Sequence, residues 1–158
     1  RPQRPAARTF LGTTWPAVQQ HVPGVKLDVV PITIAAQWRK TVAHATAVAI
    51  PGTSPLAGRW PMLQAMALGK PVLLSREAAA SLPVRHRRNA LLAAHPADWV
   101  DQSVEALTSA ELQRTLGEAG RAYVEQRGTL DATGAALLTL LRGRTDSDGD
   151  TLRLRRAA

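Results

Sequence analysis

The sequence predicts an α/β domain, and two observations support that prediction. Short apolar runs rich in β-branched residues alternate with segments whose apolar residues recur at helical spacing. Residues 45–75 contain in succession a strand pattern, a loop, a helix pattern, a tight turn and a second strand pattern. Two strands joined through a helix pair in parallel with a right-handed crossover. We therefore expect a Rossmann-like parallel sheet with flanking helices and a helical C-terminal tail.

The first thirty residues are expected to form a linker, a strand, a helix and a second strand. Residues 1–8 are rich in Pro and Arg and are interpreted as a linker or a ragged end. The apolar runs at 9–12 and 25–30 are typical of short strands, and the first of them ends in a glycine turn. Between them, Pro16 occupies the first turn of a helix predicted over 15–22.

The central third contains the most complete strand–helix–strand pattern. A helix over 37–44 is predicted from apolar residues spaced four apart, and a β-branched run over 46–50 predicts a buried strand. The helix expected over 61–68 begins with a proline, which the first turn accepts because its amides have no intrahelical acceptor. Gly69 should end this helix, and the apolar run over 71–74 should form the next strand.

The second half of the chain is expected to be largely helical. Thr108 and Glu111 have the spacing of a capping box, in which each side chain accepts an amide proton at the start of a helix. Gly128 should end the helix that they begin. The other predicted elements, in chain order, are a helical turn over 78–82, a polar loop over 85–88, a strand over 90–93, and helices over 96–107 and 130–141.

Length and charge indicate one domain over 9–143, followed by a disordered basic tail over 144–158. At 158 residues and 45% apolar content, the chain can bury a sizeable core. The net charge is +8, but residues 9–143 carry 13 Lys/Arg and nine Asp/Glu, so half of the excess lies in the two ends. We therefore expect no nucleic-acid partner. A binder of anions or nucleic acid through the basic ends is the third-ranked interpretation.

Several kinds of site are not expected. The chain has no cysteine, and its four histidines lack the spacing of metal ligands. Phosphate-loop and nucleophile-elbow motifs are also missing, and we expect no metal site in this chain. No apolar run approaches the roughly 20 residues of a membrane helix. We expect a cytoplasmic protein without an integral membrane segment, for which peripheral membrane contact stays open.

The segment PMLQAMALGKPVLLS, residues 61–75, resembles the donor-binding half of family 4 (group 1) glycosyltransferases of the GT-B fold. The family pattern there is E-x7-E-A-M-A-x-G-x-P-V. Residues 10–12 (FLG) also resemble the family's opening strand and glycine turn, and residues 116–128 (LGEAGRAYVEQRG) resemble its C-terminal helix, so the likeness covers about 9–142. The matching positions of the central pattern are Ala65, Met66, Ala67, Gly69, Pro71 and Val72.

The resemblance implies a domain that binds a nucleotide-sugar donor without a metal or a cofactor and that has no catalytic residue of its own. A loop over 52–60 and the N-terminus of the helix over 61–68 would hold the diphosphate, with the forked guanidinium of Arg59 beside it. Gln64 would accept a hydrogen bond from the ribose, and Trp60 could stack on the base or sugar. For Arg59 and Gln64 the alternative is a solvent-facing residue without a ligand, and for Trp60 it is packing in the core or in a groove. The donor-binding residues implied in this way are Gly12, Gly58, Arg59, Trp60, Met62 and Gln64.

Two departures from the family pattern support an alternative function. Leu56 and Gln64 stand where the family has its two glutamates, and the segment after Gly12 is shorter than the family's phosphate-contacting loop. The alternative is therefore a degenerate, non-catalytic domain with a role in assembly or regulation. Because the chain begins with Arg1, we expect a fragment whose N-terminal GT-B half, with the acceptor site, is missing. Alone, it should bind donor without transferring sugar.

Overall fold

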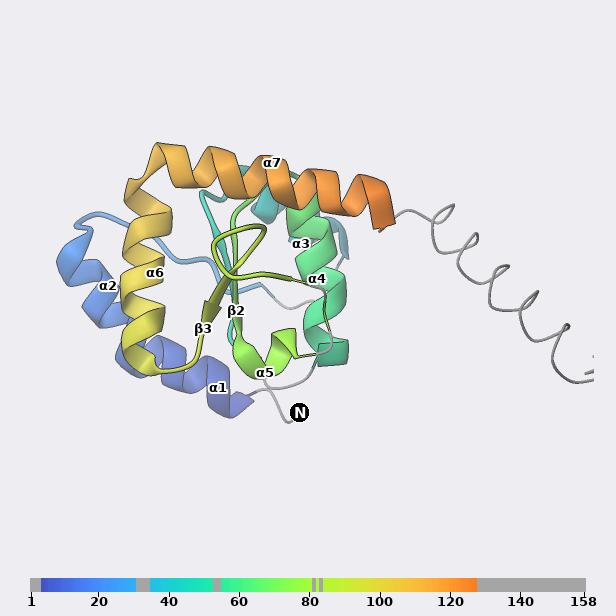
Figure 1. The fold of residues 1–158 in the computed structure, drawn as a ribbon. Helices are drawn as coiled ribbons and strands as arrows, with labels where there is room; N and C mark the ends of the chain where they lie inside the picture. Colours follow the sequence, from blue (N-terminus) through green and yellow to red (C-terminus); the bar gives the residue numbers. More distant parts are fainter. Residues whose placement is uncertain (1–3, 31–34, 53–54, 81, 83, 128–158) are drawn as a thin grey trace, which may run out of the picture.

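The computed structural model describes residues 4–30, 35–52, 55–80, 82 and 84–127 (Figure 1). Three strands in that part form a parallel sheet in the order β1-β2-β3, with helices packed against it. This confirms the prediction of an α/β domain with a parallel sheet and flanking helices. The strands are β1 (Val48–Ile50), β2 (Val72–Ser75) and β3 (Leu91–Ala93).

The strand–helix–strand unit predicted over 45–75 is present. Helix α4 (Pro55–Ala67) connects β1 to β2, and the two strands pair in register from Val48 opposite Val72. Gly69 ends the turn after α4 with a φ of +67°, which a glycine adopts without steric cost. The Gly69 amide donates to the Met66 carbonyl at 2.8 Å and the Lys70 amide to the Ala65 carbonyl at 3.0 Å, which is the Schellman pattern of a helix C-terminus.

The two faces of the sheet are buried by different helices. Val72 and Leu74 of β2 contribute to one core with α3 (Ala35–His44) and α4, whereas Leu73 contributes to the other with α6 (Pro96–Thr108) and α7 (Ala110–Arg127). Successive side chains of a strand point to opposite faces, so the continuous apolar run of β2 is buried on both sides. In Figure 1, α6 and α4 flank the sheet, and α7 crosses one end of it.

Helix α7 packs on the turn between α4 and β2 through two glycines. A Cβ atom placed on Gly117 would lie 2.3 Å from the carbonyl oxygen of Gly69, and one on Gly120 would lie 3.1 Å from the Met66 side chain. Only a residue without a side chain allows this approach of backbones. The two segments that carry most of the family resemblance are therefore in contact with each other.

The N-terminal third differs from the sequence prediction. α1 (Arg4–Thr9), the π-helical segment η1 (Phe10–Thr14) and α2 (Trp15–His21) form one continuous helical run, so the predicted strand over 9–12 is wrong, and residues 4–8 of the predicted linker are helical. Phe10, Thr14 and Val18 recur every four residues and are all buried. The ring of Phe10 meets that of Trp99 on α6 edge-on, with centroids 5.4 Å apart. Burial of this helical face therefore outweighs the strand propensity of the segment.

The second predicted strand of this region is also missing. Residues 25–30 follow α2 without a ladder partner among the described residues, although their sequence alternates in the manner of a strand. An extended segment forms a β-strand only when a neighbouring strand pairs with its backbone, and the sequence pattern of the segment does not show whether such a neighbour exists.

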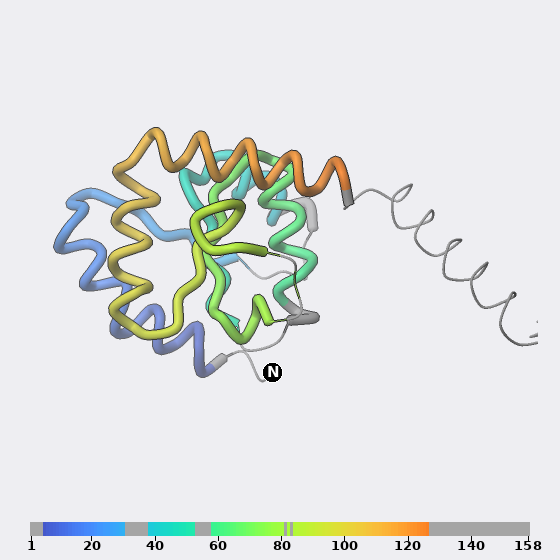
Figure 2. The backbone as a smooth tube through the Cα atoms, in the orientation of Figure 1, coloured from blue at the N-terminus to red at the C-terminus, as the bar shows by residue number. Residues whose placement is uncertain are grey.

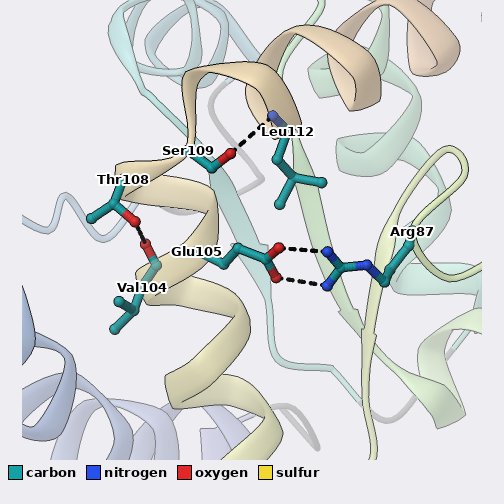
Figure 3. A network of polar contacts seen from close by, with 6 residues as sticks. All are labelled: Arg87, Val104, Glu105, Thr108, Ser109 and Leu112. Carbon is teal, nitrogen blue, oxygen red and sulfur yellow. Dashed lines mark hydrogen bonds and ion pairs between the residues drawn. The ribbon is translucent and has the colours of Figure 1, made fainter.

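Two helix starts lie elsewhere than predicted. α4 begins at Pro55, so Pro61 lies inside the helix, where its buried ring packs in the core. Ser109, not Thr108, caps α7, because its hydroxyl accepts the Leu112 amide proton at 3.2 Å while the Thr108 hydroxyl donates back to Val104 (Figure 3). Helix α5 (Arg76–Ala79) replaces the turn predicted over 78–82. The predicted helix over 130–141 and the tail over 144–158 lie outside the described residues.

Within the described ranges, none of the helices combines the length and the apolar character needed to cross a membrane.

Candidate functional site

The carboxyl ends of the three strands meet at one edge of the sheet, and a cavity of about 250 Å³ lies there. In open parallel sheets this edge is where ligands bind, because the loops after the strands and the starts of the following helices converge on it. The cavity is bordered by residues that directly follow each strand: Pro51 and Gly52 after β1, Ser75 and Glu77 at the end of β2, and Ala94, His95 and Pro96 after β3.

Ser75 connects the first two strand ends. Its buried hydroxyl donates to the carbonyl oxygen of Gly52 and accepts the Ala78 amide proton at 3.0 Å, which also caps α5. The Gly52 amide in turn donates to the Ile50 carbonyl at 2.9 Å, which closes a tight turn at the end of β1. These bonds satisfy buried backbone groups and fix the shape of the cavity floor.

The start of α6 is fixed by its own carboxylate. The Ala94 and His95 amides donate to Oδ2 of Asp98 at 2.8 and 3.0 Å. These two hydrogen bonds, first that from Ala94 and then that from His95, hold the pKa of Asp98 below its usual value, with a smaller contribution from the charge of Arg76. The carboxylate is therefore ionised at neutral pH, and it already occupies two amides that an incoming anion would use.

The surface around the cavity is more apolar than polar, and a few side chains contribute its polar groups. Glu77 contributes a carboxylate, His95 an imidazole, and Thr9 and Thr14 hydroxyl groups, while the Trp99 indole forms an apolar wall. Carboxylate and hydroxyl oxygens accept hydrogen bonds from sugar hydroxyls, and an imidazole can donate to a phosphate oxygen. The arrangement is chemically suited to a polar, hydroxyl-bearing ligand of small size.

The N-terminal helical run closes one side of this cavity. Ala6, Thr9, Phe10 and Thr14, from α1 and η1, all line it. Figure 2 shows the same run passing along the end of the sheet where β3 enters α6. A ligand bound at the strand ends would therefore contact these helices or displace them.

The structure does not gather the six residues implied by the resemblance into one pocket. Arg59 and Trp60 are exposed on α4, and the indole of Trp60 is 56% exposed. Gly58 is buried and faces Ala78 and Ile50, and Met62 is fully buried in the core. Because α4 begins at Pro55, the amides near Arg59 lie inside the helix and form no N-terminal phosphate cradle.

The other two of these residues lie apart from that group. Gln64, one turn after Trp60 on α4, has a buried Oε1 atom without a hydrogen-bond partner among the described residues. Gly12 lies in the π-helical segment, exposed, with open space around its Cα. The side chain of Leu56 is not among the described parts of the chain.

The polar loop over 85–88 is held by an ion pair rather than free. The two terminal guanidinium nitrogens of Arg87, Nη1 and Nη2, donate to the Glu105 carboxylate at 2.7 and 2.5 Å (Figure 3). This bidentate pair raises the pKa of Arg87 and lowers that of Glu105, in each case mainly through the hydrogen bonds. Arg87 has a φ of +59°, so the pair and the Arg87 amide bond to the Ala90 carbonyl hold a turn that a non-glycine residue seldom adopts.

A second and larger cavity, of about 580 Å³, lies beside β1. It runs between residues 25–30 and the whole of β1, and its lining also includes Phe10, Leu11 and, from α3, Trp38 and Val42. Its lining is predominantly apolar. No group of three or more His, Cys, Asp or Glu residues that could hold a metal occurs in the described ranges.

Sequence reasoning missed Ser75, Glu77, His95 and Asp98. A usable signal was present, because Ser75 ends one predicted strand and His95-Pro96-x-Asp98 follows another, at positions where polar residues border a ligand site. The resemblance directed attention to α4 instead. No family model matches this chain, and neither a curated protein nor a solved structure does.

Proposed function

We propose that this chain is the nucleotide-sugar-binding domain of a glycosyltransferase, in a Rossmann-like fold. The observation that supports the proposal is the cavity where the carboxyl ends of three parallel strands converge, with Glu77 and His95 on its border. The contact of Gly117 with Gly69 adds to it, because the two family-like segments pack on each other. We retain the transferase assignment from the resemblance of residues 61–75 and 116–128.

The cavity would hold a part of the donor through the polar side chains on its border. Glu77 is placed to accept hydrogen bonds from ribose or sugar hydroxyls, and His95 to donate one to a phosphate oxygen. The proposed site thus lies at the strand ends, away from Arg59 and Trp60 on α4. Transfer itself would need no metal or cofactor. It would need the acceptor and base from an N-terminal GT-B domain, so we expect this chain alone to bind donor without turnover.

The same proposal includes a cytoplasmic location, no nucleic-acid partner and contact with membranes that is at most peripheral. These follow from the resemblance and from the position of the excess charge in the two ends.

The second candidate function is a degenerate domain without donor binding. Leu56 and Gln64 replace the two glutamates of the family pattern, and the N-terminal helices occupy one side of the proposed site. The Asp98 carboxylate also uses two amides at the start of α6 and repels a diphosphate. Such a chain would retain the fold for assembly or regulation.

Calorimetric titration of the chain with UDP and GDP tests between these functions. We expect saturable binding that His95→Ala and Glu77→Gln each weaken about fivefold or more, the loss of one hydrogen bond to a ligand. Arg59→Ala is the matched control on the surface of α4 and should leave the affinity within about twofold. No binding at millimolar nucleotide by a demonstrably folded chain would favour the degenerate domain. Weakening by Arg59→Ala alone would move the site to α4.

A further inference from the structure

The large cavity beside β1 has the surroundings of a missing strand. Two uninterrupted stretches of backbone line it, namely residues 25–30 and residues 44–52, and the second of these includes β1. β1 pairs with β2 on one side, and among the described residues no ladder partner lies on its other side. Edge strands carry a row of backbone donors and acceptors that another strand can satisfy. The cavity therefore lies between a strand edge and a strand-like segment that has no ladder of its own.

The chain connection indicates which segment fits this position. Residues 9–12 precede the helix α2, with Thr13 and Thr14 between them, and residues 25–30 follow it after a short turn at Gly24. When two strands are joined through one helix in this way, they lie parallel and are commonly neighbours in the sheet. A strand over 9–12 would thus be expected beside residues 25–30, which is where the cavity lies. Phe10 and Leu11 are already among the residues that line that cavity.

Several features indicate that the helical conformation of residues 9–12 is only weakly stable. Phe10–Thr14 forms a π-helix, in which the Trp15 amide donates to the Phe10 carbonyl five residues back. Such segments are rare, and they occur mostly where a helix adjusts to a local constraint. Leu11 remains 40% exposed, and Gly12 lowers helix stability without any contact that requires a glycine. Thr13 and Thr14, both β-branched, also favour extended backbone.

We propose that residues 9–12 exchange between this helical conformation and a strand inserted between residues 25–30 and β1. Insertion satisfies the open edge of β1 and removes Thr9 and Phe10 from the wall of the cavity at the strand ends. The helical form would then cover that cavity and the inserted form would open it. The exchange depends only on the fold, so it stands whether or not the cavity binds a nucleotide.

Nuclear magnetic resonance on three forms of the chain tests the exchange: the unchanged sequence, Gly12→Ala and Gly12→Val. A Cβ atom at this position enters open space in the helical form, so the alanine variant creates no clash there, and Gly12 is itself exposed. Alanine favours helix over valine, so the ratio of inserted to helical form should differ about threefold between the two variants. The readouts are the Cα and Cβ shifts of residues 9–12 and nuclear Overhauser contacts from them to residues 25–30 and 48–50.

Amide hydrogen exchange provides a second measurement on the same samples. Insertion predicts slower exchange at residues 25–30 in Gly12→Val than in Gly12→Ala, with unchanged exchange at Leu73 in the central strand as the folding control. Strand-like shifts with contacts to both neighbours, in any of the three forms, support the proposal. Helical shifts in all three, with no such contacts and identical exchange at residues 25–30, overturn it.

Discussion

The unit from β1 to β2 and the N-terminal run from α1 to residue 30 show two different relations between sequence and structure. In the first, strand, helix, glycine turn and strand occur in the predicted order. In the second, a predicted strand is helical and another predicted strand has no partner. The first unit is fixed by local signals, namely the Gly69 turn and the apolar runs, and by contacts close in sequence. The second depends on which distant segment offers a partner.

The comparison teaches that strand pairing is the weak point of such predictions. A helix satisfies its backbone within itself, whereas a strand requires a neighbour that the sequence does not name. Residues 9–12 can satisfy their backbone as a helix and bury Phe10 against Trp99. The predictions below either separate the two regions further or remove the distinction between them.

The largest expected difference is between two apolar side chains, one from each region. Met62→Ala should lower the free energy of unfolding by about 2–5 kcal/mol, because the side chain is fully buried and its removal leaves a cavity. Leu11→Ala should cost less than about 1 kcal/mol, because that side chain is 40% exposed. Urea unfolding followed by circular dichroism measures both. Equal losses would show that residues 9–12 are buried as firmly as α4.

A pair of glycines gives the next largest difference. Gly117→Ala should destabilise the fold by about 1–3 kcal/mol, since the new Cβ meets the Gly69 carbonyl oxygen and one backbone must move. Gly12→Ala should be neutral or stabilise by up to about 1 kcal/mol, because its Cβ enters open space in a helical segment. A stable Gly117→Ala protein with an unchanged unfolding midpoint would refute the close contact of α7 with the turn.

Ser75 tests the link between the first two strand ends. Ser75→Ala should cost about 1–2 kcal/mol, because the Gly52 carbonyl loses its donor and α5 loses its cap. Thr9→Val removes an exposed hydroxyl from the N-terminal side of the same cavity and serves as the control, with an expected change below about 0.5 kcal/mol. Both are measured by thermal unfolding. Similar losses in the two variants would mean that Ser75 has no special role at the cavity.

The smallest effect expected is a pH dependence at the Arg87–Glu105 pair, which belongs to neither region. The pKa of Glu105 is lowered in the folded chain, so its contribution to stability is present above its ordinary value of 4.5 and is lost as the pH falls through the folded value. Glu105→Gln should therefore flatten the acid limb of stability between about pH 5 and pH 2 without changing the neutral plateau much. An unchanged acid limb would show that the pair is not formed in solution.

The sequence was sufficient for the fold class because periodicity, turn residues and helix ends are local properties. Gly69, Pro96 and the apolar run of β2 were identified from the pattern, and the structure has them in the expected roles. The start of α4 was misplaced, because a proline is accepted both in a first turn and, as Pro61 shows, within a helix whose neighbours bury it.

The candidate site was less predictable than the fold. Ser75, Glu77 and His95 are brought together only by the parallel register of three strands, which no local pattern encodes. Met62 and Gly58 were assigned to ligand binding from a resemblance, and the structure places them in the packing of α4 on the sheet. A motif on a helix does not show by itself which of its residues face a ligand and which face the core.

The most direct test of the proposed function is a titration of the isotope-labelled chain with UDP and with GDP, followed by amide chemical shifts. We predict saturable shifts for at least one nucleotide at Gly52, Glu77 and His95, with little change at Arg59 and Trp60. Shifts confined to Arg59 and Trp60, or none at millimolar nucleotide in a folded chain, would contradict a donor site at the strand ends.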